Sequence, residues 1–143
     1  MNVRASVEAD LVRISEIEKS AFLSSAWTKT MIFDEIKLNI DRKTWVIDLD
    51  KKLVGYCMLR YGPNEVHLVN MAVDPSVQKT GVGKKLLNHI LDNIPKYSSA
   101  YLEVKRGNFP AIKLYLNAGF KDIAIREDYY PDGEDAIVMC LNK

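Results

Sequence analysis

The chain has 143 residues, of which 48% are hydrophobic and 27% charged, and its 20 basic and 19 acidic side chains leave a net charge of +1. This balance argues against a broad basic face, and no stretch approaches the length of a membrane span. We therefore expect a soluble, cytoplasmic protein with neither a nucleic acid nor a membrane as partner. The two cysteines and two histidines show no metal-binding spacing, so no metal is expected, and the length predicts a single domain over residues 1–143.

The first 40 residues predict a short strand and two helices. The strand is expected at residues 2–6, and Ser6 is suited to cap the helix that follows. One side of that helix is apolar, through Leu11, Ile14, Ile17, Ala21 and Phe22. Trp27 and Thr28 open a second helix, whose apolar side consists of Ile32, Phe33, Ile36 and Ile40.

Residues 44–74 predict three antiparallel strands, separated by turns at residues 50–52 and 62–64. The third strand, EVHLVNMAVD, has its apolar residues at even positions up to Leu68 and at odd positions from Val69 onward. A β-bulge explains this slip, because one extra residue reverses the facing of every residue after it. A central strand buried on both faces explains the pattern equally well.

A helix is expected from Gly83 to a stop at Pro95, and a strand at residues 99–106. The apolar stripe of this helix consists of Leu86, Leu87, Ile90, Leu91 and Ile94.

The C-terminal part predicts a helix and a hairpin. Asn108 caps the helix and Gly119 follows its last turn. Strands at residues 120–130 and 135–141 form the hairpin. The order of elements predicts an α/β protein of the α+β kind, with a mixed sheet and flanking helices.

The stretch VQKTGVGKKLL, residues 77–87, joins the third strand to the helix from Gly83. It fails the P-loop template G-x-x-x-x-G-K-[ST] and lacks the third glycine of G-x-G-x-x-G. It still predicts an anion site, because Gly81 and Gly83 bring backbone amides to the positive end of a helix dipole. Lys79 and Lys84 add charge, and Gln78 adds a hydrogen-bonding side chain. An ordinary solvated turn is the alternative.

Two residues near the second half of the sheet are candidates for chemistry. Strand alternation places Glu103 opposite to Leu102 and Val104, near the end of a core strand. Tyr115 lies on the inward side of the following helix, where a phenol needs a polar partner. A solvent-facing strand glutamate and an amphipathic core tyrosine are the alternatives.

Residues 78–83, QKTGVG, match the Q/R-x-x-G-x-G/A acyl-CoA signature of the GCN5-related N-acetyltransferase (GNAT) family. Nearly the whole chain resembles the RimI branch of this family, N-terminal acetyltransferases known for modifying the N-terminal alanine of a small-subunit ribosomal protein. The resemblance is carried by residues 70–75 (NMAVDP), 102–104 (LEV), Asn108, Ala111, 114–115 (LY), 119–120 (GF), Arg126, 129–130 (YY) and 134–136 (EDA).

The resemblance implies the GNAT acyl-CoA fold and acetyl-CoA as co-substrate. In this fold a mostly antiparallel sheet contains a bulged strand, which splays from its neighbour so that the acetyl-pantetheine arm enters between them. The pyrophosphate sits on the glycine loop. The implied cofactor-binding residues are Met71, Ala72, Val73, Gln78, Lys79, Thr80, Gly81, Val82, Gly83, Lys84, Asn108 and Tyr115.

The resemblance also implies Glu103 as general base and Tyr115 as the acid, or the stabiliser, of the leaving thiolate. A free α-amine has a pKa near 8, so roughly one molecule in ten is neutral at pH 7 and one glutamate can suffice. We expect Glu103 to act best if burial raises its pKa toward neutrality.

The implied acceptor-binding residues lie in two loops and are Phe22, Trp27, Tyr129, Tyr130 and Glu134. The sequence departs from the family pattern at Ala26, where proline is usual before the tryptophan, and at Gly107, where serine is common. The sequence therefore does not specify which N-terminal residues the protein accepts.

The resulting prediction is an acetyltransferase that modifies a protein N-terminus, such as that of a ribosomal protein. One alternative keeps the chemistry and uses lysine or a small amine such as a polyamine as acceptor, since one fold serves many acceptors. Another is a non-catalytic acyl-CoA-binding module, against which the presence of Glu103 and Tyr115 argues. The pattern does not specify an oligomeric state.

Overall fold

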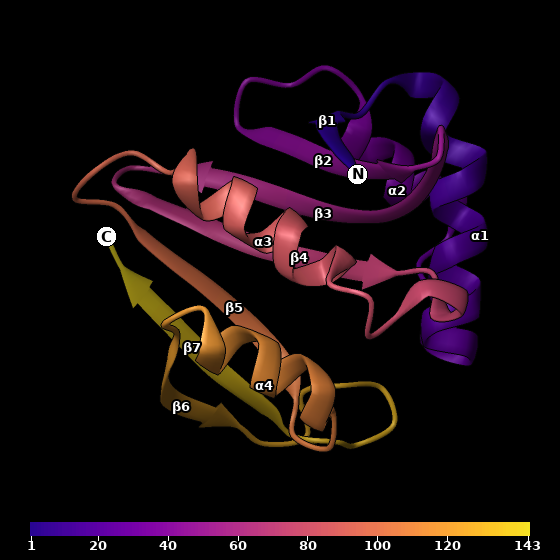
Figure 1. Ribbon diagram of the computed structural model, residues 1–143. Helices are drawn as coiled ribbons and strands as arrows, with labels where there is room; N and C mark the ends of the chain where they lie inside the picture. Colours follow the sequence, from indigo (N-terminus) through magenta and orange to yellow (C-terminus); the bar gives the residue numbers. More distant parts are fainter.

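A computed structural model describes residues 1–143 and shows a seven-stranded sheet with helices on both faces (Figure 1). The strands are β1 (Asn2–Ala5), β2 (Arg42–Leu49), β3 (Lys52–Gly62), β4 (Glu65–Val73), β5 (Ser99–Lys105), β6 (Lys121–Arg126) and β7 (Ala136–Asn142). The helices are α1 (Leu11–Phe22), α2 (Lys29–Ile36), α3 (Val82–Asp92) and α4 (Phe109–Asn117), with short 3-10 turns at Glu8–Asp10, Leu23–Ser25 and Pro75–Val77.

The strand order is β1-β2-β3-β4-β5-β7-β6, and every neighbouring pair is antiparallel except β4 and β5, which are parallel. The predicted α+β class with a mixed, mostly antiparallel sheet is therefore confirmed. No helix is long and apolar enough to span a bilayer.

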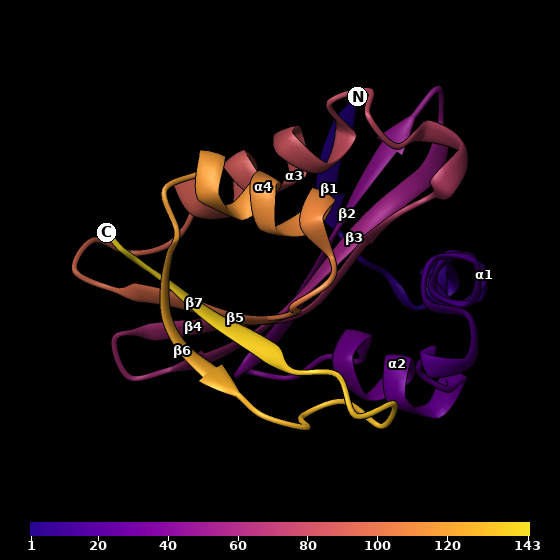
Figure 2. The same cartoon turned by 90° about the horizontal axis from the view of Figure 1, so that it is seen from below.

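The helices divide between the two faces of the sheet (Figure 2). Helices α3 and α4 cover one face over a large apolar cluster that includes Leu86, Leu102 and Tyr115. Helices α1 and α2 cover the other face over a smaller cluster that includes Ile14 and Tyr56. The apolar stripes predicted for α1 and α3 are thus the faces that these helices bury.

A bulge in β4 explains the slip in its alternation. Met58 of β3 pairs with Asn70 and the next residue, Leu59, pairs with Leu68, so Val69 is the extra residue. Before the bulge, Leu68 packs into the cluster under α3 and α4, whereas Ala72 beyond it packs under α1 and α2. The bulge interpretation is confirmed.

The bulge coincides with a separation of β4 from β5. Their pairing begins at Glu65 and Ser99 and ends at Leu68 and Leu102. Beyond that point the two strands diverge in the ribbon, and residues 70–73 have ladder partners only on β3 (Figure 1). The predicted splayed strand pair is present.

Two local expectations near the N-terminus are wrong. Ser6 does not cap α1, because a 3-10 turn at Glu8–Asp10 comes first and the Asp10 side chain accepts a hydrogen bond from Val7 N at 2.8 Å. Helix α2 ends at Ile36, so Ile40 lies outside it and is fully exposed. The start of α2 is as predicted, since the Thr28 side chain caps it.

Candidate active site

The glycine loop leads into α3 in a conformation that leaves its first amides unpaired. Gly81 has φ +88°, a left-handed conformation that a residue with a Cβ adopts only at a cost. The first hydrogen bond of the helix runs from Lys85 N to Gly81 O, so the amides of Val82, Gly83 and Lys84 precede the helical ladder. Such an end, at the positive pole of the helix dipole, suits an anion.

Two polar side chains of the loop stabilise the loop itself. Gln78 Nε2 donates to Val73 O at 3.2 Å, and the Thr80 hydroxyl donates to Val77 O. Lys79, between these two residues, has φ +66°, a left-handed backbone conformation. The predicted loop residues therefore lie together, with Gln78 and Thr80 shaping the backbone that would face an anion.

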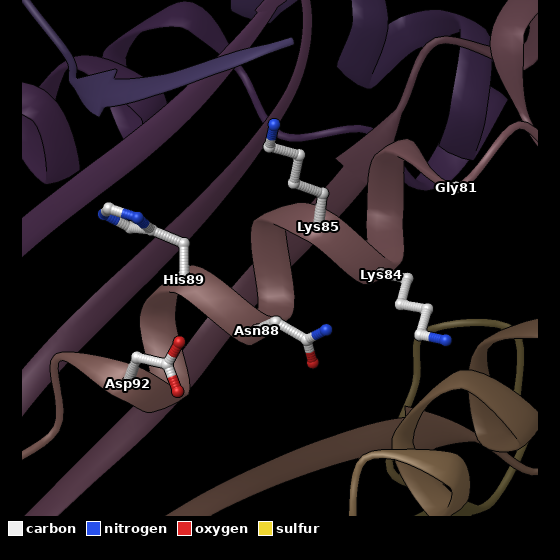
Figure 3. Close-up of a pocket in the computed structure, with 6 residues that line it drawn as sticks. All are labelled: Gly81, Lys84, Lys85, Asn88, His89 and Asp92. Atoms are coloured by element: carbon white, nitrogen blue, oxygen red, sulfur yellow. The ribbon is translucent and has the colours of Figure 1, made fainter.

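A shallow hollow of about 380 Å³ runs along the outer face of α3 from this loop (Figure 3). Its lining contains no hydrophobic residue and consists of Gly81, Lys84, Lys85, Asn88, His89 and Asp92. In Figure 3 the Lys84 and Lys85 side chains point away from each other at the N-terminal end, while Asp92 lies at the opposite end. Positive charge thus accompanies the free amides at one end of the hollow.

Gly83 lies where α3, α4 and β4 meet. A Cβ at this position would be 3.5 Å from Leu114 Cδ2 and 3.6 Å from Val73 Cγ2, in ordinary contact. Met71 and Val73 pack against the large apolar cluster, and neither residue has a ladder partner on β5. The predicted residues of the loop and of β4 therefore adjoin the splayed segment.

Tyr115 is buried at 8% exposure next to this region, with its ring edge-on to Phe120 at 5.8 Å. Burial, together with the neighbouring Cys57 and Tyr130, raises the pKa of the Tyr115 phenol. The phenol is thus held in its protonated form, which donates hydrogen bonds. Asn108, also predicted to touch the cofactor, caps α4 by accepting from Ala111 N at 3.3 Å.

Glu103 is the first residue of β5 beyond the segment paired with β4. Its Oε2 lies 2.5 Å from His67 Nε2, and its Oε1 lies 3.8 Å from Arg126 Nη2. The hydrogen bond with His67 is the main cause that lowers the pKa of Glu103; it and the positive charge of Arg126 outweigh burial, which acts in the opposite direction. The condition under which Glu103 was expected to act best, a pKa raised toward neutrality, is therefore not met, and Glu103 is an ionised acceptor at neutral pH.

Comparison with known proteins identifies the family. A sequence model described as the acetyltransferase (GNAT) family matches residues 11–120. This match covers more than half of the chain. The chain belongs to the acetyltransferase (GNAT) family.

Individual GNAT relatives agree with this assignment. The [ribosomal protein bS18]-alanine N-acetyltransferase of Escherichia coli K12 is 42% identical over 95 residues, which span 63% of this chain and 64% of that relative's length. The protein of the same name from Haemophilus ducreyi is 35% identical over 142 residues, covering 94% of this chain and 95% of the relative. The crystal structure of the ribosomal-protein-S18-alanine N-acetyltransferase from Escherichia coli matches with a TM-score of 0.91 and 30% identity, over 99% of this chain and 92% of that chain.

The loop between α1 and α2 of this GNAT protein is tied to the sheet by a buried carboxylate. Glu18, 1% exposed, accepts hydrogen bonds from Trp27 N at 2.9 Å and from Asn70 Nδ2 at 2.6 Å. The Tyr56 hydroxyl donates to the same carboxylate at 2.5 Å. The predicted residues Phe22 and Trp27 pack on the cluster under α1 and α2. Sequence reasoning missed Glu18, whose only signal was its place on the apolar side of α1.

The second predicted loop is anchored to the turn before α4. Glu134 Oε1 accepts from Gly107 N at 2.7 Å, and a Cβ on residue 107 would lie 2.7 Å from that oxygen. This contact is possible because glycine has no Cβ, and it gives the Glu134 carboxylate a hydrogen-bond donor within the protein. Tyr129 and Tyr130 stack edge-on at 5.1 Å.

Tyr130, in the loop between β6 and β7, is partly buried. Burial first, and then Tyr129 and Glu103, raises the pKa of Tyr130 to about 12. Because Tyr130 also contributes to the raised pKa of Tyr115, it lies within electrostatic range of both Glu103 and Tyr115. The structure thus gathers the predicted residues of β4, β5, α4 and the hairpin loop around the splay, with Phe22 and Trp27 on the α1 and α2 side.

Proposed function

We propose that residues 1–143 form a single GNAT domain that transfers acetyl from acetyl-CoA to the N-terminal α-amine of a protein. The observation that carries this proposal is the position of Glu103. Glu103 lies on β5 directly after the last residue that pairs with β4, and its carboxylate contacts His67 of β4. A co-substrate held from one side and an amine arriving from the other would meet there.

Acetyl-CoA would be bound chiefly by backbone groups. The free amides of Val82, Gly83 and Lys84 suit its pyrophosphate, as P-loop amides suit other phosphates. The unpaired edge of residues 69–73 offers N–H and C=O groups to the amides of the pantetheine arm. These two features lie close together, because a Cβ added at Gly83 would be 3.6 Å from Val73 Cγ2.

The lowered pKa of Glu103 favours an α-amine over a lysine as acceptor. An ionised carboxylate accepts a hydrogen bond from a neutral amine and orients its lone pair, whereas it is a weak base toward an ammonium ion. Roughly one α-amine in ten is neutral at pH 7, against about one lysine in a few thousand. A base with a low pKa therefore works best on the acceptor amine that has the larger neutral fraction at pH 7.

Tyr115 is proposed to stabilise the leaving thiolate by a hydrogen bond. Full transfer from a phenol of pKa ~10 to a thiolate of pKa ~8.5 is uphill by roughly 2 kcal/mol. The raised pKa of Tyr115 makes that transfer still less favourable. A protonated phenol facing developing negative charge can lower the barrier without giving up its proton.

The acceptor class follows from the relatives named above. They are alanine N-acetyltransferases of ribosomal protein bS18, and the alignment with Haemophilus ducreyi covers 94% of this chain. We therefore propose an N-terminal alanine, and a ribosomal protein such as bS18 as its bearer.

The test is CoA-thiol release with acetyl-CoA and a matched set of acceptors. The set comprises Ala-, Ser- and Met-starting peptides, an N-blocked peptide with one internal lysine, and spermidine. The proposal expects turnover on free N-termini only, with alanine first. Turnover on the lysine peptide or spermidine would replace it by the alternative acceptors, and acetyl-CoA binding without any turnover would favour a binding module.

A further inference from the structure

Asn70 lies on β4 directly beyond the bulge, at the start of the segment that has no ladder partner on β5. It pairs with Met58 of the cluster under α1 and α2, so its side chain lies on that face of the sheet. Glu103 lies on the same face, because its neighbours Leu102 and Val104 pack into the cluster under α3 and α4. The side chains of Asn70 and Glu103 therefore come from the two strands that separate, on the face that carries the loop between α1 and α2.

The amide of Asn70 is oriented by Glu18. Its Nδ2 donates to Glu18 Oε1 at 2.6 Å, and the Tyr56 hydroxyl donates to the same oxygen at 2.5 Å. Trp27 N, which can only donate, contacts Glu18 Oε2 at 2.9 Å. Burial, followed by the charge of Glu18, raises the pKa of Tyr56, so its hydroxyl keeps its proton. Because Glu18 accepts in all three contacts, a reversed Asn70 amide would place its own oxygen against a carboxylate oxygen.

The Oδ1 atom of the Asn70 amide is consequently turned away from Glu18. The buried side-chain oxygen and nitrogen atoms without a partner are Ser15 Oγ and His89 Nε2, so the unpaired Asn70 Oδ1 remains accessible from outside. An amide oxygen accepts hydrogen bonds through two lone pairs and has no proton to give. The protein thus presents an accessible acceptor of fixed orientation across the strand separation from the Glu103 carboxylate.

We propose that Asn70 Oδ1 accepts a hydrogen bond from the amine nitrogen of the acceptor, and that Glu18 is a positioning residue that acts through Asn70. This inference rests on the proposed acetyl transfer. A neutral primary amine has two N–H groups and one lone pair. With one N–H held by Glu103 and the other by Asn70, the direction of the lone pair is fixed for attack on the acetyl carbonyl. Glu103 receives the amine proton in the proposed transfer, whereas Asn70 only holds the nitrogen in place.

The binding of two peptides to the protein saturated with desulfo-CoA tests this, because that CoA analogue carries no acetyl group to transfer. One peptide begins with alanine, and the other carries a propionyl group in place of the alanine and so lacks only the amine. Asn70→Leu keeps the approximate shape of the side chain and removes both of its hydrogen-bonding groups. By calorimetry it should weaken binding of the alanine peptide about tenfold and of the propionyl peptide less than about twofold.

Equal weakening of both peptides overturns the hydrogen bond, because a residue that only supports the acceptor loop would affect them alike. Unchanged binding of the alanine peptide overturns it as well. Asn117→Leu, at an exposed position on α4, is the matched control and should bind both peptides as the wild type does. Either failure leaves acetyl transfer standing, whereas absence of CoA release from the wild type with acetyl-CoA and the alanine peptide overturns both.

Glu18→Gln is a second test and covers the case in which Asn70→Leu does not fold, as judged by circular dichroism. Since Trp27 N can only donate, the new amide oxygen must take the place of Oε2 and the new NH₂ group that of Oε1. The Asn70 amide then turns its oxygen inward and its NH₂ group outward, where it opposes the N–H groups of the amine.

The proposal expects Glu18→Gln to show the same selective loss, about tenfold for the alanine peptide and less than about twofold for the propionyl peptide. A folded Glu18→Gln that binds both peptides as the wild type does, or weakens both equally, overturns the role of Glu18 acting through Asn70.

Discussion

The two faces of the sheet are stabilised by different kinds of contact. Under α3 and α4 the buried cluster is formed by hydrophobic side chains and Tyr115. The layer of α1 and α2 instead buries three carboxylates, those of Asp10, Glu18 and Glu35. Apolar packing is non-directional and tolerates adjustment, whereas a buried carboxylate is stable only with its donors in place.

Each buried carboxylate ties one segment of this layer to another. Asp10 accepts from Arg4 and from Val7 N, and Glu35 is paired with Arg42 and Arg60. Glu18 binds Trp27 in the proposed acceptor loop to Asn70 just beyond the bulge. The face proposed to receive acetyl-CoA is thus held by packing, and the face proposed to receive the amine by directional hydrogen bonds. Substitutions on the face proposed to receive the amine should therefore alter acceptor binding more than acetyl-CoA binding.

The largest expected effect is at Glu103, where the two faces meet. Glu103→Gln should lower kcat by about a thousandfold, roughly 4 kcal/mol, because the amine loses its ionised acceptor. Acetyl-CoA affinity, measured by calorimetry, should stay within about twofold, since no proposed CoA contact uses this side chain. Glu127→Gln, at an exposed position, is the control and should match the wild type. Wild-type turnover in Glu103→Gln would remove Glu103 as the base.

Glu18→Ala tests whether the carboxylate face depends on its donors. It leaves the Tyr56 hydroxyl, the Asn70 amide and Trp27 N without their partner, so the free energy of unfolding should fall by about 3 kcal/mol in urea titrations. Glu16→Ala, on the exposed side of the same helix, should cost less than about 0.5 kcal/mol. In the folded Glu18→Ala protein the peptide KM should rise while the acetyl-CoA KM does not. Equal losses in the two variants would contradict the role of Glu18.

Tyr115→Phe probes the apolar face with a smaller effect. Removing the hydroxyl should lower kcat by about thirtyfold, roughly 2 kcal/mol, because the thiolate loses one donor. The ring and its packing against Phe120 remain, so acetyl-CoA affinity should change by no more than about twofold. Tyr97→Phe, at an 89% exposed position, serves as control. Unchanged turnover would take Tyr115 out of the mechanism.

Asp10→Asn should show the smallest effect and a defined pH dependence. Burial acts to raise the pKa of Asp10, but the hydrogen bonds from Arg4 and Val7 outweigh it and the pKa is lowered. A lowered folded pKa means that the ionised form stabilises the fold above about pH 4, and that this contribution is lost as pH falls toward the folded value. Asp10→Asn should therefore cost about 1 kcal/mol at pH 7 and much less at pH 3.

Urea unfolding at the two pH values measures this difference, with Asp122→Asn, at an exposed position, as control. If Asp10→Asn lowers the free energy of unfolding equally at pH 7 and pH 3, the charge of the Asp10 carboxylate is not what stabilises its contacts with Arg4 and Val7.

The sequence by itself determined the features that depend on near neighbours in the chain. The slip in alternation between Leu68 and Val69 narrowed β4 to a bulged strand or a strand buried on both faces, and the caps at Thr28 and Asn108 predicted two helix starts. These succeed because strand alternation, helical periodicity and capping act over a few residues. The motif from Gln78 to Gly83 is equally local, but it indicated the family only together with the matching residues elsewhere in the chain.

Only the tertiary structure decided which distant residues meet. The parallel pairing of β4 with β5 brings His67 to Glu103, and the packing of α1 brings Glu18 to Tyr56, Asn70 and Trp27. The lowered pKa of Glu103 follows from its neighbours His67 and Arg126, whose effect outweighs burial, and no local pattern in the sequence indicates these neighbours. Alternation states which face a side chain occupies, whereas its partner across the sheet depends on strand order and register, which no local pattern specifies.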